Sequence, residues 1–224
     1  MSKPFSIAID GPAGAGKSTI ARALAKAMNA MYLDTGAMYR AFGLAMLRRG
    51  VDVNDAEALA VHAANMDINV DYVDGAQRIY IGSEDVTDAI RTPEISAAAS
   101  ATSAVAKVRA EMVALQQRIA QGHNVVMDGR DIGTVVLPNA TLKVYLTASP
   151  EVPARRRCIE LEQKGTPQPY AQVLKEIEER DWRDMHRAAS PLTVAEGAVV
   201  VDTSDMNVEQ SVATLRALAE KTCK

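Results

Sequence analysis

Apolar residues along this chain of 224 residues gather in short runs, separated by longer segments that favour helix. The strand-like runs occupy residues 5–9, 30–33, 124–128, 142–147 and 198–202. They are almost continuously apolar, which is typical of strands that are buried on both faces of a parallel sheet. Helix-favouring segments lie between them, for example at 19–28 and 38–48. The pattern predicts a three-layer α/β fold with right-handed crossovers between parallel strands.

Residues 66–90 follow a different pattern. Asp67–Val73 and Arg78–Ile81 alternate polar and apolar positions with a period of two, and Asp74-Gly75 between them is a turn signal. The segment therefore predicts a small antiparallel hairpin inserted into the α/β chain. We expect it to form a subdomain that covers one side of the functional site, the alternative being a solvent-exposed hairpin without a role in the chemistry.

The rest of the chain predicts further helices. One or two are expected over 97–121, one over 150–164 and another up to about 188, with a break at Gly165–Pro169. An amphipathic helix over 208–218 is expected to serve packing only. The break between two arginine-bearing helices indicates a mobile lid.

Composition narrows the classes of function. The net charge of −3 argues against a general nucleic-acid binder, so positive charge for an anionic ligand has to be local. The two cysteines have no metal or redox spacing and suit reduced thiols in the cytoplasm. The N-terminal residues do not resemble a signal peptide, and no apolar run approaches about 18 residues. We expect a cytoplasmic monomer that contacts neither membrane nor nucleic acid.

The strongest chemical signal follows the first predicted strand. It consists of Gly11, Pro12, Ala13, Gly14, Ala15, Gly16, Lys17 and Ser18, followed by Thr19. This segment fits G-x-x-x-x-G-K-[ST], the phosphate-binding loop. Its glycines let backbone N–H groups surround an anion, Lys17 can reach the β- and γ-phosphates, and the Ser18 hydroxyl can ligate Mg²⁺. We therefore predict that Gly11–Thr19 binds the phosphates of a nucleotide together with Mg²⁺.

Carboxylates stand at the ends of three predicted strands, at Asp34, Asp128 and Asp202. Ligands of parallel α/β sheets bind at this edge. Asp128 resembles the second element of phosphate-loop proteins, whose carboxylate holds Mg²⁺ through water. Asp34 is a second candidate for a water-mediated metal contact. Arg130, two residues after Asp128, can clamp a phosphate through two hydrogen bonds.

A charged helical face forms a further candidate site. Its residues, at i, i+3, i+4 and i+7, are Arg180, Arg183, Asp184 and Arg187. Such a face is usually solvated, but beside a phosphate site three arginines match a highly charged transition state. Asp184 could hold one guanidinium or accept a hydrogen bond from a base. Arg155–Arg157 is a second basic cluster, of which at most two members can face one ligand. Trp182 is expected to pack rather than to stack on a base.

Several segments together resemble the bacterial cytidylate kinases of the nucleoside monophosphate kinase group, over nearly the whole chain. They are Ile9–Thr19, Leu33–Arg40, Ile90–Glu94, Asp128–Val136, Glu179–Arg187 and Ser190–Leu192. The first motif occurs in many ATPases, whereas Leu33–Arg40 and Asp128–Val136 together are far more specific.

The resemblance implies transfer of the γ-phosphoryl group of ATP to CMP or dCMP. It also implies one kinase domain over residues 1–224 that contains a monophosphate-binding insert at about 36–115 and a lid at about 153–170. The predicted hairpin fits the enlarged insert of this family, which favours cytidylate over adenylate kinase.

The resemblance also implies roles for individual residues. The monophosphate substrate would contact Thr35, Tyr39, Arg40, Ser100, Arg109, Arg130, Asp131, Arg180, Asp184 and Arg187. Of these, Arg40, Arg130 and Arg187 are the better candidates for its phosphate. Ser100, Arg109, Arg180 and Asp184 would frame the base and its surroundings. The catalytic set would be Lys17, Arg130 and Asp131, joined by Arg155 and Arg157 from the lid.

Two alternatives stay open at this point. One is another phosphate-loop kinase that acts on UMP, AMP, shikimate or dephospho-coenzyme A. The other is a regulatory module that binds ATP or GTP tightly and transfers nothing to a monophosphate. The arginine-rich acceptor site argues against such a module, because hydrolysis by water needs no second phosphate clamp.

Overall fold

The structure is a computed structural model that describes residues 4–163 and 165–223. Contacts divide the chain into two compact units. The first comprises the chain up to Met31 together with the chain from Gly122 onward, and the second comprises Tyr32–Gln121. None of the helices described is both long and apolar enough to cross a membrane.

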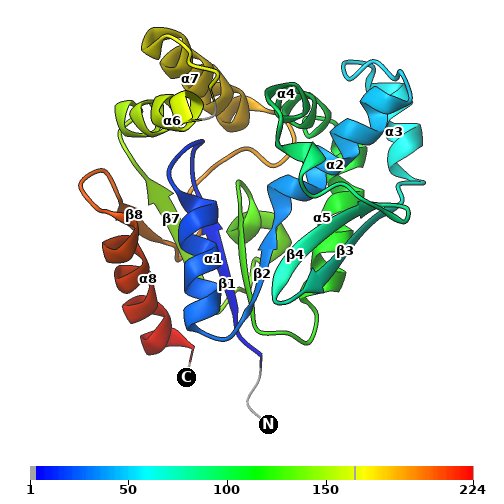
Figure 1. Cartoon of the computed structure of the whole chain (residues 1–224). Helices are drawn as coiled ribbons and strands as arrows, with labels where there is room; N and C mark the ends of the chain where they lie inside the picture. The colour runs from blue at the N-terminus through cyan, green and yellow to red at the C-terminus, as the bar shows by residue number, and fades with distance from the viewer. Residues whose placement is uncertain (1–3, 164, 224) are drawn as a thin grey trace. The chain divides into compact units, whose positions relative to one another are not determined.

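The first unit is built on parallel strands (Figure 1). Its central strand β1 (Ser6–Asp10) lies between β6 (Val125–Gly129) and β7 (Leu142–Thr147), and β8 (Val199–Asp202) follows β7. With β2 (Met31–Asp34) the strand order is β2-β6-β1-β7-β8. The chain therefore adopts the predicted parallel α/β arrangement. The carboxyl ends of β1 and β6 lie next to each other.

Burial differs among the strands. Nearly all of β1 and β6 is buried, as their continuous apolar runs predict. In β8, however, Val199 and Val200 are 38% and 55% exposed. The interpretation of 198–202 as a strand buried on both faces is therefore wrong. β8 is the last strand in the order, and of its four residues only Val201 is covered by neighbouring elements.

The helices of the first unit form two groups. α1 (Lys17–Ala27) and α8 (Val208–Thr222) contact each other and lie along the sheet (Figure 1). α6 (Glu151–Gln163) and α7 (Tyr170–His186) form a separate pair. Its apolar contact consists of Ala154, Leu161 and Val173, with Cys158, Leu174 and Ile177 packed against them. The helix predicted over 150–164 is confirmed up to Gln163, while Lys164 lies outside the described residues.

The second unit combines helices with the predicted hairpin. Its helices are α2 (Thr35–Arg48), α3 (Ala56–Ala63), α4 (Pro93–Thr102) and α5 (Ala106–Ala120). Its antiparallel sheet consists of β3 (Ile68–Val73), β4 (Ala76–Ile81) and the two-residue strand β5 (Glu84–Asp85). Asp74 and Gly75 both have positive φ, at 53° and 75°, as expected for a tight hairpin turn. The predicted hairpin is confirmed.

The packing of α2 against α4 depends on a small residue. A Cβ on Gly43 would lie 3.0 Å from the backbone nitrogen of Ala99 and 3.2 Å from the Cβ of Ala98. The two helices thus approach each other closely at this glycine. α2 also begins at Thr35, earlier than the predicted Met38, because the Asp34 side chain accepts a hydrogen bond from Ala37 N–H and caps the helix.

Candidate active site

The phosphate loop joins β1 to α1, and two of its glycines are required by close neighbours. Gly11 has φ 149°, and a Cβ there would collide with the carbonyl oxygen of Leu146 in β7. Gly14 has φ 71°, and a Cβ there would collide with Pro153 in α6. The sequence therefore places glycine where β7 and α6 approach the loop, and α1 follows directly with its N-terminal N–H groups at the loop.

Lys17 is buried at the start of α1, where its ammonium donates to the carbonyl oxygen of Pro12. Burial, reinforced by the positive charge of Arg130, lowers the pKa of Lys17 to about 7. Beside it, the Ser18 hydroxyl donates to Oδ2 of Asp128 at 2.7 Å. The structure thus brings together two of the residues predicted to hold Mg²⁺, the loop serine and the carboxylate of β6.

Asp10, the last residue of β1, holds the neighbouring loop. Its two carboxylate oxygens accept hydrogen bonds from Ile132 N–H at 2.8 Å and Gly133 N–H at 2.7 Å. Burial raises the pKa of Asp10 to about 6, although both N–H donors act in the opposite direction. This carboxylate fixes the segment that follows Asp131, and sequence reasoning gave it no role.

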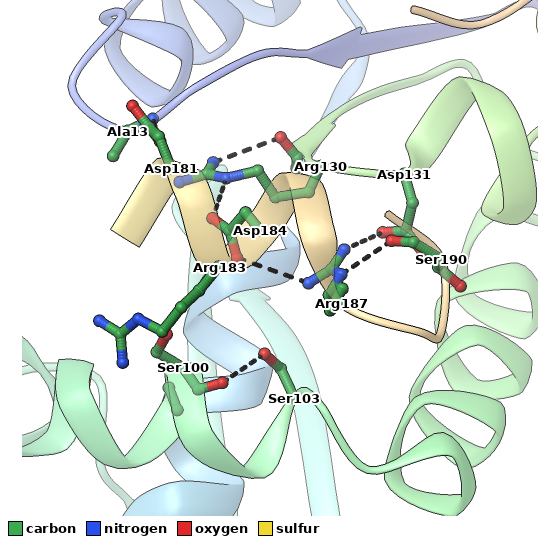
Figure 2. Close-up of polar contacts among 12 residues, drawn as sticks. Ala13, Ser100, Ser103, Arg130, Asp131, Asp181, Arg183, Asp184, Arg187 and Ser190 are labelled. Carbon is green, nitrogen blue, oxygen red and sulfur yellow. Dashed lines mark hydrogen bonds and ion pairs between the residues drawn. The ribbon is translucent and has the colours of Figure 1, made fainter. Parts of the chain in front are cut away.

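A cluster of alternating charges joins Arg130 and Asp131, which follow β6, to the end of α7 (Figure 2). Arg130 Nε donates to Oδ2 of Asp184 at 2.8 Å, and Arg187 lies 3.6 Å from Asp184 and 4.0 Å from Asp131. Burial works against the charge of Arg130, but Asp184 raises its pKa above the ordinary value. Burial likewise opposes ionisation of Asp184, yet Arg130 and the neighbouring arginines lower its pKa. The expectation that Asp184 holds a guanidinium is confirmed.

The predicted four-residue face is only partly correct. Arg180 is half-buried, and its charge lowers the pKa values of both Asp184 and Lys17. Arg183 is exposed, donates to the carbonyl oxygen of Glu179 and points away from the Arg130–Asp184 pair (Figure 2). Because successive residues of a helix are about 100° apart around its axis, Arg180 and Arg183 point in directions about 60° apart. This difference is enough to leave Arg183 in solvent.

Trp182 does not pack into the core, which corrects the sequence-based interpretation. Its side chain is 62% exposed, and its ring stacks on that of His186 with centroids 4.6 Å apart. The reason is its position on the outer side of α7, next to the exposed Arg183.

The basic cluster on α6 divides among different partners. Arg155 is exposed, and Arg157 pairs with Glu160 at 3.1 Å. Arg156, which received no individual role from the sequence, reaches the phosphate loop: a Cβ on Gly16 would lie 3.7 Å from its Nη1. Its NH2 donates to the carbonyl oxygen of Met206 at 3.3 Å.

In the second unit, Asp34 is the centre of a polar cluster. Besides capping α2, its carboxylate lies 3.3 Å from Arg40 and 3.3 Å from Arg91. Its backbone N–H donates to Oε1 of Gln77 in β4 at 2.7 Å. Arg91 and Gln77 were not predicted, although Arg91 lies in one of the segments that carry the resemblance. The hairpin is thus bonded to the residue that caps α2.

A second cluster in this unit links α2 to α4 and α5. The guanidinium of Arg109 lies 5.4 Å from the centre of the Tyr39 ring and donates to the carbonyl oxygen of Ser103 at 3.2 Å. The Ser103 hydroxyl in turn donates to the carbonyl oxygen of Ser100 (Figure 2). Thr35 is buried at the start of α2. Within this unit, Tyr39, Ser100 and Arg109 therefore belong to one connected group.

The first unit thus carries a phosphate loop, a serine–aspartate pair beside it and a separate cluster of arginines and carboxylates. On this parallel α/β framework, these features define an ATP-dependent phosphotransferase of the P-loop kinase class.

Comparisons with known proteins narrow this class. The family model described as cytidylate kinase matches residues 7–221. Cytidylate kinase of Caldicellulosiruptor bescii is 46% identical over 99% of this chain and 98% of its own length. Cytidylate kinase of Pelotomaculum thermopropionicum is 50% identical over 92% of each chain. The chain belongs to the cytidylate kinase family.

A solved structure supports the fold. A crystal structure of shikimate kinase from Bacteroides thetaiotaomicron superposes with a TM-score of 0.50 at 17% identity and covers 96% of this chain and 98% of the other. At this level of identity the likeness concerns the fold alone.

Proposed function

We propose that this chain transfers the γ-phosphoryl group of ATP to CMP or dCMP, giving ADP and CDP or dCDP. The observation that supports the proposal is the presence of two separate groups of cationic side chains in the first unit. Lys17 and the phosphate loop suit a donor triphosphate, and the cluster of Arg130, Asp131, Asp184 and Arg187 suits a second phosphate. Membership of the cytidylate kinase family supports cytidine nucleotides as the acceptors.

In this proposal, catalysis consists of positioning and charge neutralisation. The loop N–H groups and Lys17 hold the donor phosphates. Arg130 and Arg187 hold the acceptor phosphate in line with the γ-phosphorus, while Asp184 orients both guanidinium groups. An oxygen of the CMP phosphate is already anionic near neutral pH, so no side chain has to remove a proton from the nucleophile.

Mg²⁺ is the proposed cofactor. The hydrogen bond of Ser18 to Asp128 brings a hydroxyl and a carboxylate together beside Lys17, and oxygen ligands of this kind fit the ion. Among the residues described, no group of three or more His, Cys, Asp or Glu side chains forms a ready metal cage. In this proposal the ion is held mainly by phosphates and water, with Ser18 and Asp128 as protein partners. When bound, Mg²⁺ would neutralise charge on the β- and γ-phosphates.

We propose that the second unit is the monophosphate-binding insert. Its candidate substrate contacts are Thr35, Tyr39, Arg40, Ser100 and Arg109. The contacts of Asp34 with Arg40, Arg91 and Ala37 N–H support a positioning role for this carboxylate. This role would add to the metal contact predicted for Asp34. α6 with the start of α7 would form the lid, with Arg155 and Arg157 available to reach bound phosphates.

The experiment that tests the function is phosphoryl transfer from Mg²⁺–ATP to a panel of CMP, dCMP, UMP, AMP, GMP and shikimate. We expect the highest kcat/KM for CMP and dCMP. A preference for AMP or shikimate would keep the phosphotransferase class but contradict the cytidine assignment. Absence of transfer to every acceptor, with ATP still bound, would contradict the proposal and favour a regulatory module.

A further inference from the structure

Asp181 on α7 makes a direct contact with the phosphate loop. Its Oδ1 accepts a hydrogen bond from Ala13 N–H at 2.6 Å. Burial raises the pKa of Asp181, whereas Ala13 N–H, Arg130 and Lys17 act in the opposite direction. The loop that is proposed to hold the donor phosphates is thus bonded to a helix far away in sequence.

The same helix holds the second anion site. Asp184 stands three residues after Asp181, on the next turn of α7, and accepts the hydrogen bond of Arg130 Nε. Residues at this spacing are neighbours on a helix surface. α7 therefore contacts the phosphate loop through Asp181 and the acceptor cluster through Asp184 (Figure 2).

We propose that Asp181 is a positioning residue that couples donor binding to acceptor binding, through its hydrogen bond to Ala13 N–H. This inference deepens the proposed function and rests on it. Donor phosphates fix the backbone of the loop, Ala13 fixes Asp181, and α7 passes this order to Asp184 and Arg130. Because such coupling is reciprocal, CMP orders the phosphate loop by the same route.

The test measures this coupling as a ratio of dissociation constants. The Kd of CMP is measured by calorimetry with and without a saturating amount of the β,γ-imido analogue of ATP and Mg²⁺, which cannot transfer. In the wild-type protein we expect the analogue to tighten CMP binding about fivefold or more. Asp181→Ala should bring the ratio to within about twofold of one while changing the Kd of each nucleotide alone less than about threefold.

Two matched variants separate the hydrogen bond from other effects. Asp181→Asn keeps an oxygen that can accept from Ala13 N–H and should retain most of the coupling. Arg183→Ala, an exposed position on the same helix, should keep the wild-type ratio. If Asp181→Ala does not fold, Asp181→Ser, whose side chain is too short to keep the contact, takes its place.

Unchanged coupling in Asp181→Ala, loss of coupling in Asp181→Asn, or a ratio near one in the wild-type protein would each overturn the inference. If the wild-type protein does not bind CMP, the proposed function fails and the inference fails with it. Normal transfer to CMP with unchanged coupling in Asp181→Ala overturns the role of Asp181 alone.

Discussion

At the scale of single residues, Lys17 is the cation proposed to bind the donor phosphates. Lys17→Ala should lower kcat for CMP by about 10²–10³, because it removes a buried charge that stabilises the transferred phosphoryl group. Steady-state kinetics at saturating ATP and CMP measure the effect. Lys26→Ala, on the exposed side of the same helix, is the matched control and should stay within about twofold of wild type. A kcat near the wild-type value in Lys17→Ala would remove this residue from the donor site.

Asp10 makes the stability of the protein depend on pH. Its pKa of about 6 in the folded protein lies above the ordinary value of 3.8, so the folded state binds the proton more tightly than the unfolded state. Its contribution to the free energy of unfolding therefore decreases as the pH rises from about 4 to about 6, by at most about 3 kcal/mol.

Urea unfolding of wild type and Asp10→Asn between pH 4 and 7.5 measures this change. The stability of the wild type relative to Asp10→Asn should decrease across that range, because asparagine does not titrate. A difference that stays constant with pH would contradict the raised pKa.

Some of these residues could be predicted because their signal is local. Lys17 and Ser18 belong to one contiguous motif, and Asp128 directly ends an apolar run. The hydrogen bond between Ala13 and Asp181 joins residues 168 positions apart, and that between Asp10 and Ile132 joins residues 122 positions apart. No local pattern encodes such pairs, so the roles of Asp10 and Asp181 emerge only from the fold.

At the scale of elements, one side of α7 is covered at Asp184, and the side that carries Arg183 is exposed to solvent. Asp184→Asn should raise the KM for CMP about tenfold or more, because it removes the charged partner of the partly buried Arg130. The Kd of ATP should change less than about threefold. Arg183→Ala should leave both values near those of the wild type. Equal losses of ATP and CMP affinity in Asp184→Asn would contradict the assignment of this cluster to the acceptor.

The contact between α2 and α4 predicts a stability effect within the second unit. Gly43→Val should lower the free energy of unfolding by about 1–3 kcal/mol, because the added side chain meets the backbone of Ala99 and the Cβ of Ala98. Gly43→Ala should cost less than Gly43→Val. Chemical denaturation of the three proteins tests this order, and a Gly43→Val protein as stable as wild type would contradict the close approach.

The sequence predicted which segments form strands and helices better than it predicted how exposed their residues are. The apolar runs and the period-two alternation correctly predict the strands and the hairpin, because these patterns reflect which side chains are covered. The exposure of β8 and of Trp182 was not predictable, because it depends on which neighbours the finished fold supplies. The start of α2 at Thr35 depends on a single cap by Asp34.

At the scale of the whole molecule, an overall charge of −3 coexists with local arginine clusters in both units. Each cluster is balanced by carboxylates that hold the guanidinium groups in place. This balance explains why composition alone argues against a nucleic-acid binder but gives no indication of the two proposed phosphate sites. The specific motifs carry that information, and membership of the cytidylate kinase family agrees with them.

The most direct test of the central claim follows the transferred phosphoryl group itself. The protein is incubated with Mg²⁺ and ATP labelled in its γ-phosphate, together with CMP, and the products are separated. We predict that the label appears in the β-phosphate of CDP, with little label in inorganic phosphate. Label found only in inorganic phosphate, or retained in ATP, would contradict phosphoryl transfer to CMP.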